Sequence, residues 1–200
     1  MTNSIDKLAE LFEKFPGVGK RQAKRFVYFL LRKNSGYGKE LSDAVLNLKK
    51  NIRLCEESFQ FFYSESGQTL SPIARDENRD NSKLMIVEKD SDLENIEKMS
   101  VYNGKYFVLG GSIPILSKDP TQYIRETELL KIIEKKKDGL KEIILALSVN
   151  PQGENTLEYL QKILTKFEIK ISILGRGLST GTELEYSDKD TFLSAFDNRK

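Results

Sequence analysis

Two glycines and a group of basic residues near the N-terminus have the types and spacing of a phosphate-binding site. Gly17 and Gly19 lie where a tight turn needs unrestricted backbone torsion angles and where another backbone must approach closely. The amides after the turn open a helix, whose N-terminus favours anions. The candidate contacts are Lys20, Arg21, Lys24 and Arg25. Because Arg21 and Arg25 are four residues apart, both project from one face of that helix.

The charge around this turn favours nucleic acid over a hairpin whose glycines serve packing only. Between residues 14 and 53 there are eleven basic and two acidic side chains, so this segment carries +9 in a chain of formal net charge +2. Residues 54–80 carry −4. A basic segment in a nearly neutral chain is typical of a surface that meets a polyanion. Four basic residues within six positions predict phosphate contacts that are independent of base sequence and sensitive to salt.

The residue counts exclude several classes of enzyme and of metal site. The 200 residues contain no histidine and one cysteine. This removes histidine-based nucleophile systems, histidine metal sites, intramolecular disulfides and four-thiolate zinc sites. With 38% hydrophobic residues the chain is expected to be globular. The N-terminus lacks the pattern of a signal peptide and no apolar run approaches the ~18–20 residues that span a bilayer, so we expect a cytoplasmic protein with no membrane association.

Two kinds of hydrophobic periodicity divide the chain. Up to residue 53, apolar residues at helical spacing predict three helices, with breaks at Pro16-Gly17 and at a turn over residues 35–38. Residues 54–82 lose this periodicity and are expected to form a connector. After residue 82, strand candidates at 84–87, 106–109, 143–147 and 169–174 alternate with helical patterns at 92–99, 125–137 and 154–167. This alternation predicts an α/β fold with a parallel sheet and helices on both faces.

The hairpin sequence FPGVGKRQAKRFVYFLL resembles the helix-hairpin-helix motif of the bacterial recombination mediator family RecR. The resemblance covers nearly the whole chain and includes RGLSTGTELEYSD near the C-terminus, with Ser179 where the family usually has proline. It implies a hairpin that binds DNA, a four-cysteine zinc finger, a Toprim domain and a C-terminal segment. The family's DNA-contacting positions fall on Arg21 and Arg25. Lys20 and Lys24 stand where proline and glutamine are common, so this hairpin is more basic than the usual pattern.

At the zinc finger the chain departs from the family pattern. Cys55 aligns with the first ligand, but Ser58, Ser71 and Ala74 occupy the other three ligand positions. One thiolate cannot hold tetrahedral zinc. We therefore predict a metal-free, degenerate zinc-finger connector, and we expect no cofactor in the chain. The residues predicted to stabilise this connector by packing are Phe59, Phe61, Phe62, Leu70 and Ile73.

The acidic residues of the Toprim-like half favour a domain that is not catalytic. Glu88 follows a strand where Toprim enzymes keep a glutamate, and Asp92 and Glu154 are the other candidates for a Mg²⁺ site. Catalytic members also need an Asp-x-Asp pair after a later strand, because Mg²⁺ is usually held by more than one carboxylate. Residues 143–156 contain no aspartate, so we expect no enzyme activity and interpret Asp90-Ser91-Asp92 as helix-capping residues. A Mg²⁺-dependent Toprim nuclease built on the three acids is the alternative.

The resemblance implies a DNA-binding mediator of recombinational repair. Such a protein would act with RecO, and in some bacteria RecF, to load RecA on single-stranded DNA as a ring-like clamp of homodimers or tetramers. Glu88 and Glu154 are the candidates for docking RecO, and single- and double-stranded DNA are both expected ligands. A scaffold that scarcely touches DNA without RecO is another alternative. The expected parts are a hairpin region (1–53), the connector (54–80), a Toprim domain (81–174) and an oligomerisation segment (175–200).

Overall fold

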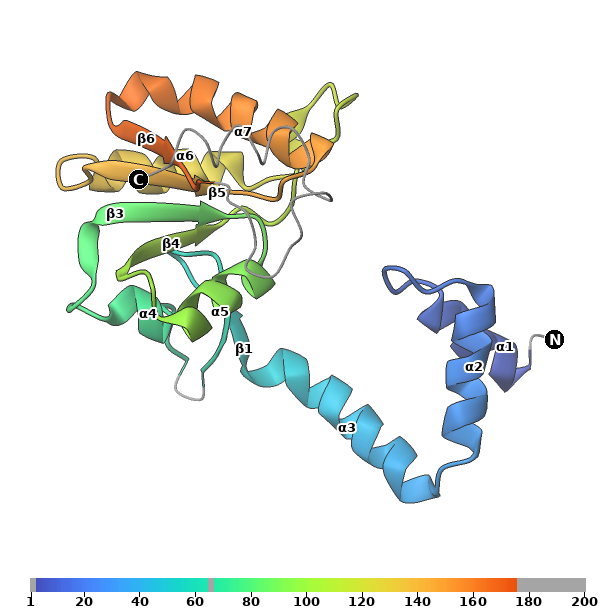
Figure 1. Cartoon of the computed structure of the whole chain (residues 1–200). Coiled ribbons are helices and arrows are strands. Elements are labelled where there is room, and N and C mark those ends of the chain that lie inside the picture. The colour runs from blue at the N-terminus through green and yellow to red at the C-terminus, as the bar shows by residue number, and fades with distance from the viewer. Residues whose placement is uncertain (1–2, 65–66, 176–200) are drawn as a thin grey trace, which may run out of the picture. The chain divides into compact units, whose positions relative to one another are not determined.

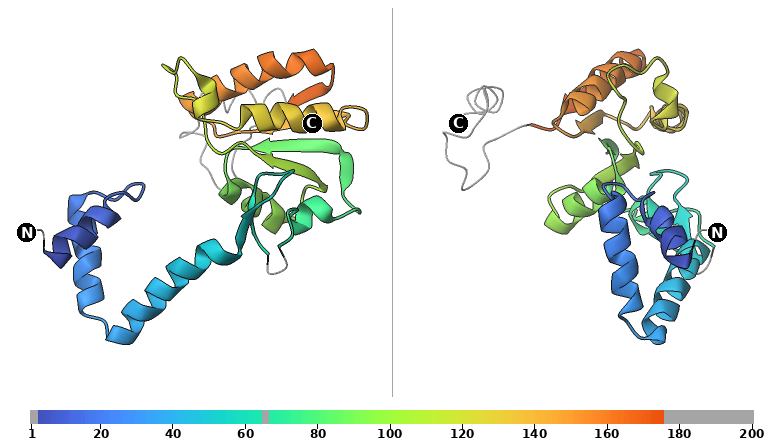
Figure 2. Two further views of the ribbon diagram at one scale, coloured as in Figure 1. Left: turned by 180° about the vertical axis from the view of Figure 1, so that it is seen from behind. Right: turned by 90° about the vertical axis from the view of Figure 1, so that its right-hand side faces the viewer.

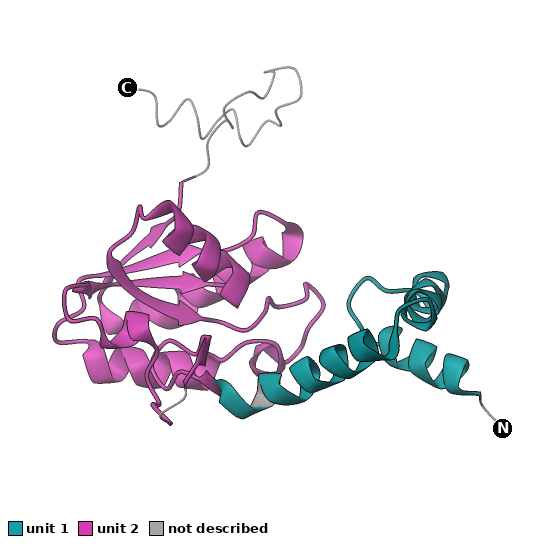
Figure 3. Ribbon diagram, turned by 90° about the horizontal axis from the view of Figure 1, so that it is seen from below, with its two compact units in different colours: residues 1–52 teal, residues 53–200 magenta. Residues whose placement is uncertain are grey.

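The computed structural model describes residues 3–64 and 67–175, apart from the side chain of Lys49. The chain divides into two compact units, residues 1–52 and residues 53–200 (Figure 3). Most of the predicted C-terminal oligomerisation segment, including Ser179, lies outside the described residues. None of the helices within the described ranges has the length and apolar character that a bilayer span requires.

Unit 1 contains three helices, and the first two share a small core. The helices are α1 (Ser4–Phe12), α2 (Lys20–Leu31) and α3 (Ser35–Asn51). Ala9 of α1 packs with Ala23 and Val27 of α2, and none of the three is more than 2% exposed. Small side chains at the contact let the two helices approach closely. Gln22, Phe26 and Leu30 of α2 are partly buried beside this stripe, and the other side chains of α2 are exposed.

The third helix begins earlier than the sequence pattern predicts. The predicted turn over residues 35–38 is wrong, because these residues form the first turn of α3. Asn34 caps the helix: its side-chain oxygen accepts a hydrogen bond from the N–H of Tyr37 at 2.9 Å. A cap of this kind stabilises a helix by about 1 kcal/mol, which helps to offset the cost of Gly36 and Gly38 in helical conformation. All the described side chains of α3 are exposed.

Unit 2 is built on a four-stranded parallel sheet, as the alternating pattern predicts (Figure 1). The strands, in sheet order, are β4 (Gly104–Val108), β3 (Asp80–Val87), β5 (Glu142–Ala146) and β6 (Lys170–Ile173). The connecting elements are α5 (Asp90–Met99), η1 (Pro120–Gln122), α6 (Glu126–Lys136), α7 (Pro151–Leu164) and η2 (Thr165–Phe167). Parallel neighbours need crossover connections of this kind.

Helices cover both faces of the sheet (Figures 1 and 2). Successive side chains of a strand point to opposite faces, and β3 shows this directly. Leu84 and Ile86 join the cluster that includes residues of α6 and α7, whereas Met85 and Val87 join the cluster that includes Leu93 of α5. The predicted α/β class with helices on both faces is therefore confirmed, and the carboxyl ends of β3 and β5 meet at one edge of the sheet.

The connector contains only short elements. They are β1 (Ile52–Leu54) and β2 (Phe61–Tyr63), which form a two-stranded sheet, and α4 (Pro72–Arg75). Ser71 starts α4, because its side chain accepts a hydrogen bond from the N–H of Ala74 at 3.2 Å. The lack of long periodic runs in this part of the sequence corresponds to these short elements.

Candidate functional site

The hairpin between α1 and α2 is open on its outer side. Gly17 has φ +74°, a conformation that side chains other than glycine adopt only with strain. A Cβ atom built on Gly17 or on Gly19 would meet nothing within 4 Å. Gly19 precedes α2 without a side-chain cap, so the first N–H groups of α2 lack a capping side chain. The hairpin therefore offers free donors and no steric barrier to a ligand backbone.

Four basic residues follow the hairpin on the first turns of α2. Lys20, Arg21, Lys24 and Arg25 are all exposed. Lys24 Nζ lies 3.6 Å from a carboxylate oxygen of Asp6, which is the one ion pair among the described side chains of unit 1. The first turn of α2 contains no acidic residue. An anion at this helix end would therefore interact with the cations and with the helix dipole at the same time.

Alanine substitutions at Gly17 of the hairpin and at Gly38 of α3 are expected to change the free energy of unfolding in opposite directions. Gly17→Ala is expected to destabilise the chain by about 1 kcal/mol, because alanine is strained at positive φ. Gly38→Ala in α3 is the matched control, because a Cβ there meets open space and alanine is the better helix former. It is expected to stabilise by about 0.5–1 kcal/mol. Urea unfolding of both variants measures the sign of each change in the free energy of unfolding. Equal effects would contradict the assignment of Gly17 to a backbone conformation that requires glycine.

The four former zinc-ligand positions of the connector come together in the structure. The sulfur of Cys55 accepts hydrogen bonds from the backbone N–H of Ser58 at 3.5 Å and of Ser71 at 3.3 Å. Gln60 joins the cluster, because its side-chain oxygen accepts from the Ser58 hydroxyl at 3.3 Å and from the Ser71 hydroxyl at 3.2 Å. Ala74 is linked to Ser71 through its N–H. A hydrogen-bonded cluster thus occupies the four positions that the family resemblance aligns with zinc ligands.

This cluster does not fit a zinc ion. It offers one thiol, and both serine hydroxyls are already used as donors to Gln60. Tetrahedral zinc needs four thiolate, imidazole or carboxylate ligands. Burial raises the pKa of the Cys55 thiol, but the hydrogen bonds from Ser58 and Ser71 lower it by more. Within residues 3–64 and 67–175, no group of three His, Cys, Asp or Glu side chains could hold a metal ion.

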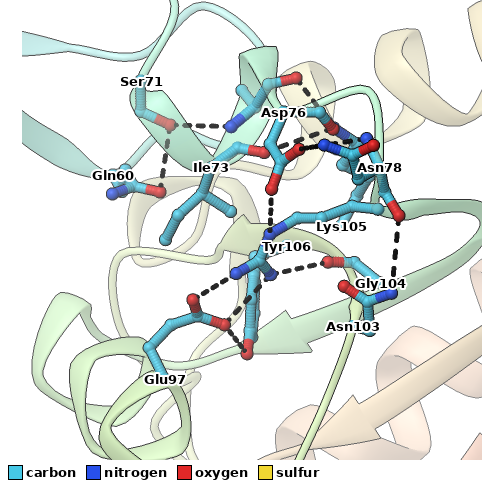
Figure 4. Close-up of polar contacts among 12 residues, drawn as sticks. Gln60, Ser71, Ile73, Asp76, Asn78, Glu97, Asn103, Gly104, Lys105 and Tyr106 are labelled. Carbon is cyan, nitrogen blue, oxygen red and sulfur yellow. Dashed lines mark hydrogen bonds and ion pairs between the residues drawn. The ribbon is translucent and has the colours of Figure 1, made fainter. Parts of the chain in front are cut away.

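The second half of the connector is anchored to β4 by charged hydrogen bonds (Figure 4). The ammonium of Lys105 donates to the carbonyl oxygens of Ile73 at 3.2 Å, Ala74 at 2.9 Å and Asp76 at 2.8 Å. Lys105 is buried. It therefore satisfies the carbonyls at the end of α4, which a helix leaves without partners. Sequence analysis did not identify Lys105, whose only signal is a charge inside the apolar run of β4.

The guanidinium of Arg79 stabilises the segment between α4 and β3. Arg79 donates to both carboxylate oxygens of Glu97 and, at 3.1 Å, to the carbonyl of Gly104 (Figure 4). The hydroxyl of Tyr106 donates to the same carboxylate at 2.6 Å. Burial and this hydrogen bond raise the pKa of Tyr106. The segment between α4 and β3 is thus tied to α5 and β4 by polar contacts.

The predicted packing of the connector needs one correction. Phe59 packs against Phe107 of the sheet core, with ring centroids 5.2 Å apart, and Ile73 packs against the cluster on the α5 face. Phe62 is buried and Leu70 is partly buried. Phe61, however, is 57% exposed, because successive residues of β2 alternate in direction and only Phe62 points inward.

The acids at the carboxyl end of β3 have separate partners. Glu88 is 3% exposed, and its carboxylate accepts a hydrogen bond from the Ser148 hydroxyl at 2.6 Å and pairs with the Lys89 ammonium at 3.0 Å. Asp92 accepts from the N–H of Lys89 at 3.0 Å, in a capping box of α5. The carboxylate of Glu88 is therefore neutralised within the fold. This arrangement does not fit a Mg²⁺ ion, which needs carboxylates free to face it.

The other two acids at this edge, Asp90 and Glu154, lie in different environments. Asp90 does not cap α5, because Lys89 is the N-cap; its carboxylate instead accepts a hydrogen bond from the N–H of Phe61 at 2.7 Å and ties β2 to α5. Glu154 lies half-buried in the first turn of α7. A docking role for Glu88 and Glu154 stays a prediction.

The environment of Glu88 predicts a specific acid sensitivity. Burial raises the pKa of its carboxyl, but Ser148 and Lys89 lower it by more, so the pKa lies below its usual value. A lowered folded-state pKa stabilises the fold above the usual pKa, and this contribution is lost as the pH falls through the folded-state value. In urea unfolding between about pH 5 and pH 3, Glu88→Gln is expected to lose stability less steeply than the parent. The exposed Glu94→Gln serves as the control. Parallel curves of unfolding free energy against pH for all three proteins would contradict a lowered pKa of Glu88.

Comparison with known proteins identifies the family. Residues 5–49 match the family model described as "RecR, helix-hairpin-helix", and residues 82–175 match the model of the Toprim domain. The Recombination protein RecR of Bifidobacterium adolescentis is 33% identical, over 98% of this chain and 96% of its own length. The chain belongs to the RecR family. Two further RecR proteins, from Dehalococcoides mccartyi and Syntrophotalea carbinolica, are 35% and 32% identical and cover 98% and 100% of this chain and 94% and 97% of their own lengths.

Membership of the RecR family assigns both units of the chain to the same cellular process. The helix-hairpin-helix match contains the open hairpin and all four basic residues of α2. The Toprim match contains the parallel sheet and its acidic edge. The relatives are named recombination proteins, which assigns this RecR-family chain to DNA recombination and repair and associates it with DNA.

Proposed function

We propose that the chain is a recombination mediator that holds DNA through its hairpin and carries out no catalytic step. The observation that carries this proposal is the combination of an unobstructed glycine hairpin with four exposed cations on the helix that it opens. Such contacts reach the sugar-phosphate backbone and not the base edges. Binding is therefore expected for both single- and double-stranded DNA, whatever the sequence.

The mediator acts with protein partners in this proposal. RecO, and RecF in some bacteria, assist it in loading RecA on single-stranded DNA, and RecO docks at the edge of the sheet where Glu88 and Glu154 lie. Because Glu88 is 3% exposed and is paired with Ser148 and Lys89, Glu154 is the more accessible of the two acids. Membership of the RecR family and the concentration of positive charge in residues 14–53 support this assignment. The two surfaces would let one chain contact DNA and a partner at the same time.

The proposal includes an assembly of dimers into a ring-like tetramer. Each protomer brings a segment of +9, and several such segments on one DNA molecule raise the affinity by increasing the effective concentration of the next contact. Light-scattering mass with and without DNA tests this assembly. A tetramer that forms or tightens on DNA is the expected result, and a monomer under both conditions would contradict the clamp.

DNA binding by the purified chain, measured from low to high salt, tests the central claim. The logarithm of the association constant is expected to fall linearly with the logarithm of the salt concentration, by about 0.9 per phosphate contact on duplex DNA and about 0.7 on single strands. Binding that appears only when RecO is added would overturn direct DNA binding and favour a scaffold.

A further inference from the structure

An aromatic and basic surface adjoins the hairpin cations and shares Arg25 with them, while its aromatic rings have no part in the proposed hairpin contacts. Its six residues, here called the α2 patch, are Arg25, Tyr28, Phe29, Arg32, Lys33 and Tyr37. Four of them, Arg25, Tyr28, Phe29 and Arg32, line a hollow of about 370 Å³, which is in the size range of sites for small organic groups. Tyr28 is 50% exposed and Phe29 is 48% exposed.

Two rings of the α2 patch, those of Phe29 and Tyr37, contact each other and a cation. The rings of Phe29 and Tyr37 meet edge to face, with centroids 6.0 Å apart. The ammonium of Lys33 lies 4.9 Å from the centroid of Phe29 and 5.9 Å from that of Tyr37. Neither ring belongs to the α1–α2 core, which consists of other residues. These aromatic side chains are therefore ordered at the surface without being needed for the core.

The patch continues the track of the hairpin cations along one face of α2. Arg21, Arg25, Tyr28, Phe29 and Arg32 occupy positions i, i+4, i+7, i+8 and i+11 of the helix. Residues at this spacing share a helix face, and eleven residues of helix extend about 16 Å. A nucleic-acid strand that meets the hairpin cations can thus continue over the aromatic rings.

We propose that the α2 patch is a stacking site for the unpaired bases of single-stranded DNA. Tyr28 and Phe29 supply the aromatic faces, while Arg25 and Arg32 hold the flanking phosphates. Stacking on aromatic side chains does not depend on base identity, because every base has a π-face. The site rests on the proposed DNA binding of the hairpin and adds a preference for single strands, since the bases of a duplex are stacked on one another and cannot reach the rings without being unstacked.

The charge of the patch argues against a second copy of the chain as its occupant. In a two-fold symmetric contact both copies use the same surface, so the like charges of Arg25, Arg32 and Lys33 from both copies would gather in one interface. The segment from residue 15 to residue 38 contains no acidic side chain that could compensate these charges. Phosphate groups compensate them directly.

Leucine substitutions test the stacking role while keeping apolar bulk. Tyr28→Leu combined with Phe29→Leu is expected to lower the affinity for an oligo-dT strand by about tenfold or more. The affinity for a duplex of equal length, and the slope of both salt titrations, should change little because no charge is removed. Tyr123→Leu, which removes an exposed ring from unit 2, is the control and is expected to leave both affinities unchanged.

The outcomes separate this inference from the proposed function. An unchanged ratio of single-strand to duplex affinity in the leucine variant would overturn the stacking site, while the proposed function stands if Arg21→Ala with Arg25→Ala still weakens both. A change of light-scattering mass without a change in that ratio would assign the patch to a second copy. In the unsubstituted protein, strands that carry 5-iodouracil are expected to cross-link on irradiation to Tyr28, Phe29 or Tyr37, and cross-links mapped only elsewhere would also overturn it.

Discussion

Replacement of both Arg21 and Arg25 with alanine is expected to weaken DNA binding about thirtyfold at low salt and to do so equally for all base sequences. Each exposed guanidinium that contacts a phosphate contributes on the order of 1 kcal/mol. Among the described residues neither arginine forms an ion pair with a carboxylate, so both guanidinium groups are available to phosphates. The salt slope on duplex DNA should fall by about 1.8 per protomer, because two phosphate contacts disappear. Titration of labelled DNA by anisotropy at several salt concentrations measures both quantities.

A charge-matched variant separates local contacts from net charge. Lys131→Ala with Lys166→Ala removes the same two positive charges from exposed positions of unit 2. If the hairpin binds DNA, this control changes the slope by much less than the arginine pair does. Equal effects of the two variants would show that DNA responds to overall charge and that the hairpin serves only to pack α1 against α2.

Substitution of Lys105 by methionine is expected to destabilise unit 2 by about 3 kcal/mol. Methionine keeps the apolar stem but removes the ammonium that donates to the carbonyls of Ile73, Ala74 and Asp76. The carbonyl of Asp76 keeps a second donor, the N–H of Arg79 at 3.4 Å. Hydrogen bonds from a charged group contribute about 1.5–3 kcal/mol each, and unsatisfied buried acceptors cost further free energy. Urea unfolding of the purified chain gives the difference in the free energy of unfolding.

The exposed Lys118→Met is the control for this substitution and should unfold like the parent. Added zinc is expected to change the unfolding midpoint of neither variant, because the Cys55 cluster lacks the ligands for the ion. A Lys105→Met protein within about 0.5 kcal/mol of the parent would show that the connector is held by packing alone.

The helical and strand periodicities located every main element of both units. The four predicted strands correspond to β3, β4, β5 and β6, because a buried parallel strand needs a short apolar run that is visible in the sequence. The turn predicted at residues 35–38 was wrong. Two glycines indicated a break, but the capping hydrogen bond of Asn34 starts α3 ahead of them.

The connector was predicted only in part, because its stability depends on contacts between distant residues. The absence of a complete set of zinc ligands is evident from residue types alone. The hydrogen bonds that hold the connector are not evident from residue types, because they join distant residues. Gln60 accepts from Ser71, eleven positions away, and Lys105 donates to Ala74, thirty-one positions away. The exposure of Phe61 likewise follows from which face of β2 turns to the core.

The sequence by itself determined the basic glycine hairpin, because its glycines and cations lie within the nine consecutive residues 17–25 and the helix that carries the cations follows local rules. It also determined the α/β class and the lack of a complete set of zinc ligands in the connector. Only the tertiary structure decided that Glu88 is buried beside Ser148, which lies sixty residues away, and that Lys105 holds the end of α4. It also brought Tyr37 of α3 against Phe29 of α2. Such contacts depend on how the elements pack. The hydrophobic periodicity along one element does not show which other elements lie next to it.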